Sequence, residues 1–69
     1  MRYKVNVRLG KKIKKFRKEL KMTQEELAEK VKLHYTSLSR IERGETNPPV
    51  QTVRRIAQAL KKSLKDLFE

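Results

Sequence analysis

TQEELAEKVKLHYTSLSRIERG, residues Thr23–Gly44, has the pattern of two short helices joined by a tight turn. Its apolar residues recur at the spacing of two amphipathic helices, residues 24–31 and 35–43. Thr23 and Glu26 have the T-x-x-E spacing of a capping box, which marks where the first helix begins. Gly44 marks the end of the second, because glycine readily takes the left-handed conformation that closes a helix. The stretch therefore predicts a helix-turn-helix.

One face of each of these helices is apolar, and the two faces would hold the helices together. The inward residues are Leu27, Ala28, Val31, Leu33, Leu38 and Ile41. Polar side chains remain on the outer face of the second helix. An α-helix fits the major groove of DNA, where all four base pairs present different hydrogen-bonding groups. The outer face therefore predicts a helix that reads DNA bases.

Four outward side chains are the predicted base contacts: Tyr35, Thr36, Ser37 and Arg40. Residues near the start of an inserted helix do most of the reading. Arg40 can donate two hydrogen bonds to guanine, while Thr36 and Ser37 can bond base edges or phosphates. Tyr35 has a second interpretation, as a half-buried surface aromatic. His34 is interpreted as a loop residue that stands where a better helix cap is usual.

Four further side chains are predicted to contact DNA phosphates: Gln24, Arg43, Thr46 and Asn47. Gln24 begins the helix 24–31, whose free N–H groups and positive dipole end attract an anion. The other three lie at the end of the second helix and in the loop after it. Arg43 has an alternative role, which is to close its helix against the helix dipole.

Three more helices are expected outside this motif. The apolar residues of the first, residues 7–20, are Leu9, Ile13, Phe16 and Leu20. The Asn-Pro-Pro run at residues 47–49 blocks helix continuation. A helix over residues 50–60 follows, with the apolar residues Val50, Val53, Ile56, Ala57 and Leu60. In the last helix, residues 64–68, the apolar residues are Leu64, Leu67 and Phe68, and Ser63 with Asp66 would form its cap.

Residues 1–6 are predicted to form a basic N-terminal arm, and residues 7–69 a single helix-turn-helix domain. Asn6 would then cap the first helix. A strand is the alternative, because apolar and polar residues alternate from Tyr3 to Leu9. One short strand cannot stand alone, so the arm is favoured.

Arg17 and Glu42 lie beside the apolar faces of their helices, next to Phe16 and Ile41. An ion pair between them would tie the first helix to the DNA-reading helix. This arrangement would make Arg17 a structural residue instead of a DNA contact.

The composition is strongly basic, with 19 Lys or Arg against eight Asp or Glu and a net charge of +11 in 69 residues. Such a balance favours a polyanionic partner, although a solvated lysine-rich surface is an alternative. The chain has no Cys and one His, which excludes a Cys-based zinc site and a multi-His metal site. No metal, cofactor or small-molecule ligand is predicted.

The same inventory argues against an enzyme and a membrane protein. No nucleophile–base pair and no phosphate-cradling glycine loop is evident in the sequence. No apolar run approaches the roughly 20 residues that span a bilayer. A cytoplasmic location is therefore expected.

The chain resembles the phage-repressor/Cro-type helix-turn-helix DNA-binding domains, the XRE-like family of regulators. The resemblance rests on LGKKIKKFRKE, MTQEELAEKV, SLSRIERGETNPP and SLKDLF, and covers Leu9 to Phe68 without gaps. It implies an all-α, compact five-helix, lambda-repressor-like fold with the helix-turn-helix formed by helices 2 and 3. It also implies base contacts at Tyr35, Thr36 and Arg40 with Ser37 flanking, phosphate contacts from Gln24 and the loop after helix 3, and the pairing of Arg17 with Glu42.

The function that the resemblance implies is sequence-specific regulation of transcription on double-stranded DNA, by a repressor or a restriction–modification controller. Its members usually bind palindromic operators as homodimers, which here would form in solution or only on DNA. Two alternatives remain. One is an antitoxin-like or adaptor protein that mainly binds another protein, and the other is a polyanion-binding protein without sequence preference.

Three turn positions where the family commonly has Gly are here Lys21, Lys32 and Lys61. A left-handed conformation at a non-glycine residue costs roughly 1 kcal/mol. Either these turns are built differently or the core compensates the strain. Lys62 also replaces a usual apolar residue before the last helix, which weakens a dimer interface there.

Overall fold

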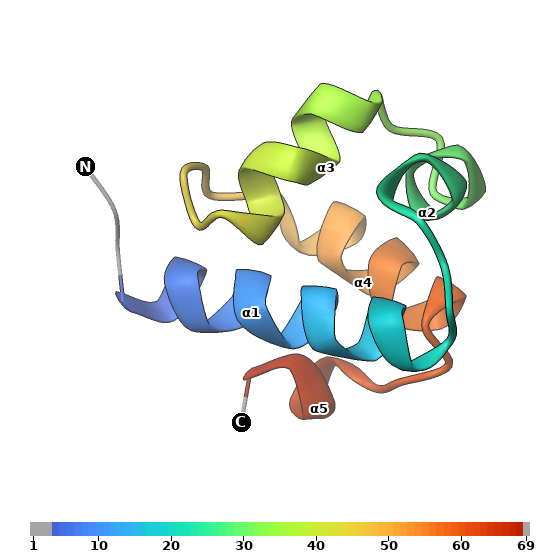
Figure 1. The fold of residues 1–69 in the computed structure, drawn as a ribbon. Helices are drawn as coiled ribbons and strands as arrows, with labels where there is room; N and C mark the ends of the chain where they lie inside the picture. The colour runs from blue at the N-terminus through green and yellow to red at the C-terminus, as the bar shows by residue number, and fades with distance from the viewer. Residues whose placement is uncertain (1–3, 69) are drawn as a thin grey trace.

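The computed structural model describes residues 4–68, and these form five helices without a strand. In chain order they are α1 (Lys4–Glu19), α2 (Gln24–Lys30), α3 (Tyr35–Glu42), α4 (Val50–Ala59) and α5 (Leu64–Phe68). Figure 1 shows α3 above α1 with α4 behind them, α2 at one end and α5 beside α1. The predicted all-α, five-helix fold is confirmed.

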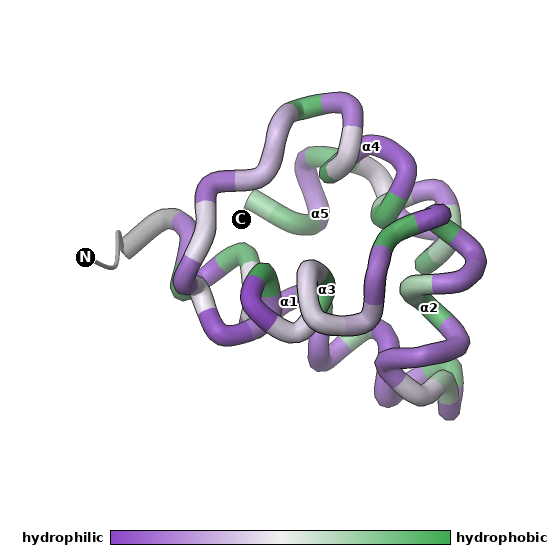
Figure 2. Tube along the Cα trace, turned by 90° about the horizontal axis from the view of Figure 1, so that it is seen from above, coloured by the Kyte–Doolittle hydropathy of each residue, from purple (hydrophilic) through white to green (hydrophobic). Residues whose placement is uncertain are grey.

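All five helices contribute to one apolar core. Its largest fully buried side chains are Ile13, Leu27, Leu38, Ile56, Leu60 and Leu67. Burying one such side chain contributes about 1.5–3 kcal/mol. Figure 2 shows hydrophobic residues recurring among hydrophilic ones along the helices, which is the pattern of amphipathic helices around a shared core.

Two predicted core residues are wrong. Leu20 is 41% exposed because α1 ends at Glu19, so Leu20 lies in the turn that follows. Val50 is 64% exposed because it is the first residue of α4, ahead of the turn that packs on the core. Both residues have the spacing of the apolar face, but each lies at a helix end that does not pack on the core.

Helix α1 begins at Lys4, three residues before the predicted start. The strand alternative is therefore wrong for residues 4–10, and the arm interpretation is wrong for residues 4–6. Asn6 is buried within the helix and does not cap it. Residues 1–3 of the predicted arm lie outside the described residues. The reason is tertiary, because the start of α1 packs against the end of α3: a Cβ on Gly44 would lie 2.7 Å from Cα of Val7.

Gly10 lets α1 and α3 approach each other closely. A Cβ at this position would lie 2.5 Å from the carbonyl oxygens of both Ile41 and Glu42. Real Cβ atoms do not come this close to backbone oxygen, so any larger residue would force the two helices apart. Gly10 is a requirement of packing that no local pattern in the sequence indicates.

The left-handed turns are real. Lys21, Lys32 and Lys61 have φ angles of 57°, 58° and 60°, and Gly44 has 74°. After each lysine, the next N–H closes the helix on a carbonyl five residues back: Met22 N to Arg17 O, Leu33 N to Ala28 O, and Lys62 N to Ala57 O. These are the long bonds of the Schellman motif. The turns are thus built with lysine in the left-handed position that glycine usually takes, and lysine carries the strain.

Both predicted caps are present. Oγ1 of Thr23 accepts from the N–H of Glu26 at 3.0 Å, and Oε1 of Glu26 accepts from the N–H of Thr23 at 2.8 Å. At α5, the backbone N–H and hydroxyl of Ser63 both donate to Asp66, which lowers the pKa of the Asp66 carboxyl. His34 occupies the cap position of α3 without a side-chain hydrogen bond, as predicted.

Candidate nucleic-acid interface

Arg17 and Glu42 form the predicted ion pair, and both residues are buried. Nε of Arg17 donates to Oε2 of Glu42 at 2.7 Å, and Nη2 donates to Oε1 at 3.1 Å. The remaining amino group of Arg17, Nη1, donates to the carbonyl oxygen of Met22 at 2.8 Å. A two-point guanidinium–carboxylate contact fixes the angle between its partners as well as their distance.

Gln24 joins the same network. Its Nε2 donates to Oε1 of Glu42 at 2.9 Å. Glu42 therefore receives bonds from α1 and from the first residue of α2, while it ends α3. The network holds three helices at one point, and the orientation of α3 on the domain follows from it.

The outer face of α3 carries the residues predicted to contact bases. Tyr35, Thr36, Ser37 and Arg40 are exposed, with 47% of Tyr35 accessible. Leu38 and Ile41 are buried against the core, and Ser39 is half-buried, off the row. In Figure 1, α3 runs along the edge of the molecule with no other described helix above it. This row is free to enter a groove.

A shallow groove of about 220 Å³ brings α3 together with the loop that follows it. Ser37 and Arg40 line it from α3, while Thr46 and Asn47 line it from the loop. Two predicted base contacts and two predicted phosphate contacts are thus neighbours. Pro48 and Pro49 form part of the wall, so the extended loop that they impose shapes the groove.

Thr52 completes this groove and was missed by sequence reasoning. It lies in the first turn of α4, which begins directly after the two prolines. The signal available in the sequence was a polar residue between Val50 and Val53, on the side of the helix away from the core. A hydroxyl there suits a phosphate oxygen as well as it suits water.

The other predicted residues do not line this groove. Tyr35 and Thr36 lie earlier on α3, and Gln24 faces Glu42 from α2. Gln24 has a second amide hydrogen, so the contact with phosphate predicted for it stays a prediction. Nε of Arg43 lies 3.1 Å from Oε2 of Glu45 in a largely exposed pair, which holds the guanidinium near the loop.

The described residues offer no other obvious chemistry at this surface. No group of three or more His, Asp or Glu side chains that could hold a metal ion occurs in residues 4–68. None of the helices described is long and apolar enough to cross a membrane.

Arg40 is the charged residue that lines the groove, and no acid lines it. The groove therefore attracts an anion more strongly than a cation.

Comparison with known proteins gives consistent results. A helix-turn-helix family model, HTH_3, matches residues 13–67. The immunity repressor protein of Bacillus phage phi105 is 46% identical over 52 residues, which are 75% of this chain and 36% of that protein. The control protein C.BamHI of Bacillus amyloliquefaciens is 39% identical over 67 residues, 93% of this chain and 83% of that protein.

A solved structure agrees in fold. The regulator SinR, described as the master regulator for biofilm formation in complex with DNA, superposes with a TM-score of 0.83 at 37% identity. The match covers 88% of this chain and 98% of that chain. The chain thus spans nearly all of some relatives and about a third of the phage repressor.

Proposed function

The chain belongs to the HTH_3 family of helix-turn-helix DNA-binding regulators, and from this premise we propose that it controls transcription by placing α3 in the major groove of a specific operator. The observation that carries the proposal is the groove in which Ser37 and Arg40 of α3 lie beside Thr46 and Asn47. Base-reading and phosphate-binding side chains must be adjacent, because the bases of a duplex lie between its backbones. Its named relatives are regulators and not enzymes.

In this proposal the exposed row on α3 supplies sequence specificity. Arg40 donates to O6 and N7 of one guanine. Thr36 and Ser37 contact the neighbouring base edges, and Tyr35 stacks or hydrogen-bonds at the start of the helix. The Arg17–Glu42 pair does not touch DNA, because it is buried; it sets the angle at which α3 leaves the domain.

Phosphate contacts flank this row on both sides. Thr46 and Asn47 bind the backbone beside the groove, together with Arg43. The second amide hydrogen of Gln24 binds the opposite backbone. These contacts position α3 without reading sequence, and they make the affinity salt-dependent.

We further propose that the protein acts as a homodimer on a palindromic operator. A two-fold dimer places two α3 helices in successive major grooves, about 34 Å apart. The repressor and restriction–modification control functions named for similar proteins are the activities that such occupancy supports. Because DNA is the partner, we place the protein in the cytoplasm.

The test is selection of bound sites from a random pool of duplex DNA by the intact chain. Recovery of a palindromic motif with half-sites about one helical turn apart would support a dimeric operator-binding regulator. A single half-site would support reading by α3 but contradict the dimer. Recovery of no motif at all would overturn the proposal.

Binding without sequence preference is a second candidate, favoured by the cationic face of α1. Arg8, Lys11, Lys12 and Lys15 line a shallow surface there. Lys62 adds its ammonium 4.6 Å from the centre of the Phe16 ring. Both candidates predict affinity that falls with salt, but only a regulator keeps a large ratio of specific to non-specific affinity.

A further inference from the structure

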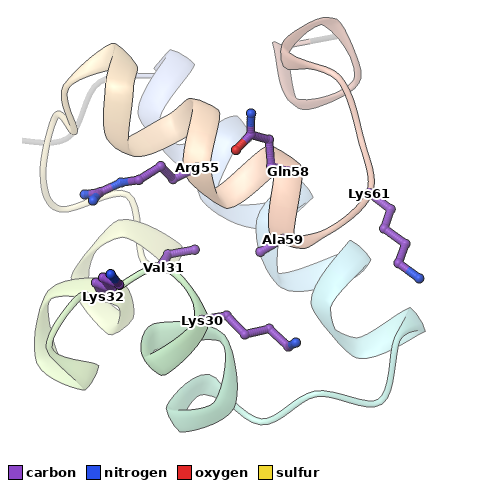
Figure 3. Close-up of a pocket in the computed structure, with 7 residues that line it drawn as sticks. All are labelled: Lys30, Val31, Lys32, Arg55, Gln58, Ala59 and Lys61. Carbon is purple, nitrogen blue, oxygen red and sulfur yellow. The ribbon is translucent and has the colours of Figure 1, made fainter.

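A cationic cleft lies between the end of α2 and the second half of α4. Its volume is about 570 Å³, and its lining residues are Lys30, Val31, Lys32, Arg55, Gln58, Ala59 and Lys61. They come from the end of α2, the turn after it, the second half of α4 and the turn after α4 (Figure 3). None of them lines the groove that contains Ser37 and Arg40. The cleft is a separate feature of the surface.

Four of its seven lining residues are cations, and no described acid lines it. Within residues 4–68, the ion pairs are Arg17–Glu42 and Arg43–Glu45, so none of the four cations has an acidic partner there. Like charges gathered around one cleft repel each other and disfavour the folded state. An anion bound among them would relieve that repulsion.

Two of these cations have a left-handed backbone conformation. Lys32 and Lys61 have φ angles of 58° and 60°, where glycine would be free of strain. Each occupies the turn position after its helix, one following α2 and the other following α4. The turns therefore place lysine side chains on both sides of the cleft.

The arrangement of the side chains suggests the shape of a ligand. In Figure 3, Arg55 and Lys32 lie on one side of the cleft, while Lys30 and Lys61 extend to the other. Val31 and Ala59 lie between the two pairs, and Gln58 offers an amide above them. The site thus has two separated positive ends and an apolar floor.

We propose that this cleft binds a small polyphosphate, an anion with two or more linked phosphate groups. One phosphate would lie between Arg55 and Lys32 and another between Lys30 and Lys61. Arginine presents paired N–H donors to phosphate, and lysine acts as a point charge. The volume lies within the range of small-molecule sites, about 300–1,000 Å³. Inorganic polyphosphates and nucleoside polyphosphates share this chemistry.

The site has a mechanical consequence. Its residues join α2 to α4 across the turn that leads into α3. A polyphosphate that bridges the two sides would hold the end of α2 against α4, and so would raise the free energy of unfolding by mass action. The inference does not depend on the proposed function, because its residues are distinct from those of the α3 groove.

The experiment is calorimetric titration of the intact chain with tripolyphosphate, repeated with a nucleoside triphosphate and with citrate. The test variant is Arg55→Gln with Lys61→Gln, which removes one cation from each side. The matched control is Lys14→Gln with Lys18→Gln, which removes the same charge from the exposed face of α1. Backbone amide NMR shifts locate the ligand, and circular dichroism checks that each variant is folded.

We expect the test variant to lose about tenfold or more in tripolyphosphate affinity, since two charge-assisted contacts are removed, and the control to change less than about twofold. Amide shifts should concentrate at residues 30–32 and 55–61. Tighter binding of the nucleoside triphosphate would assign the source as a nucleotide, and equal or weaker binding would assign it as inorganic polyphosphate. Equal losses in the two variants, equal affinity for citrate, or shifts centred on α3 would each overturn the inference.

Discussion

Arg17 of α1 and Glu42 of α3 form a buried, two-point ion pair, with N–O distances of 2.7 and 3.1 Å. Gln24 of α2 donates to the same carboxylate. One side chain at the end of α3 thus receives hydrogen bonds from two other helices. The pair links stability to function, because the angle of α3 determines which of its side chains can reach DNA bases together.

Glu42→Ala should destabilise the domain strongly. It leaves the Arg17 guanidinium buried without its counter-charge, which costs about 3–5 kcal/mol. Urea unfolding followed by circular dichroism measures the loss. The control is Glu29→Ala, an exposed acid on α2, which should change stability by no more than about 0.5 kcal/mol. Similar small losses in both variants would show that the pair contributes little.

Gly10→Ala should destabilise the protein, although the same change inside an isolated helix is stabilising by about 0.8–1 kcal/mol. The added Cβ would lie 2.5 Å from two carbonyl oxygens of α3, so the helices must separate at a cost of about 1–3 kcal/mol. Thermal unfolding gives the sign. Lys14→Ala, on the exposed face of α1, is the control and should be nearly neutral. A gain in stability for Gly10→Ala would contradict the close approach.

Lys21→Gly should stabilise the domain by up to about 1 kcal/mol, because it relieves a left-handed lysine. Lys18→Gly, three residues earlier in the last turn of α1, should have the opposite sign and cost about 1 kcal/mol. Chemical denaturation of both variants compares them directly. If both lost stability equally, the left-handed turn would carry no strain.

Arg40→Ala should weaken binding to the selected operator by about 1–3 kcal/mol and relax the preference at one base pair. The reason is the loss of the base contact proposed for Arg40 in the last turn of α3. Quantitative binding to the operator and to its single-base variants measures both effects. Arg43→Ala is the comparison, because loss of a phosphate contact should weaken all sequences alike. Uniform weakening by Arg40→Ala would remove its assignment as a base contact.

The cap of α5 should make stability depend on acidic pH. Hydrogen bonds from Ser63 hold the pKa of Asp66 below its ordinary value of 3.8. A carboxyl whose folded pKa is depressed contributes stability above its unfolded pKa, and this contribution is lost as pH falls through the folded pKa. The Asp66 titration, followed by NMR, should therefore lie below 3.8 in the native protein. Ser63→Ala keeps the backbone hydrogen bond and removes the hydroxyl one, so it should move the midpoint upward in part. An unchanged midpoint would contradict the contribution of the hydroxyl.

Local patterns in the sequence determined the central motif. The capping box of Thr23 and Glu26, the left-handed Gly44 and the phase of Leu38 and Ile41 each act within a few residues. They therefore predicted where α2 and α3 lie and which face of α3 is exposed. The same holds for the Ser63 cap of α5. The left-handed conformation of Lys21, Lys32 and Lys61 was one of two possibilities that the family resemblance left open.

Only the tertiary structure decided the start of α1, the need for glycine at Gly10, the bond from Gln24 to Glu42 and the place of Thr52 in the groove. Each depends on contact between residues far apart in the chain. For the residues before Gly10 the sequence offered an arm or a strand, and packing against the end of α3 selects a helix instead. Helix caps and hydrophobic periodicity depend on residues that are close together in the sequence, so the sequence alone determines them. The distance between two helices depends on how the whole core packs.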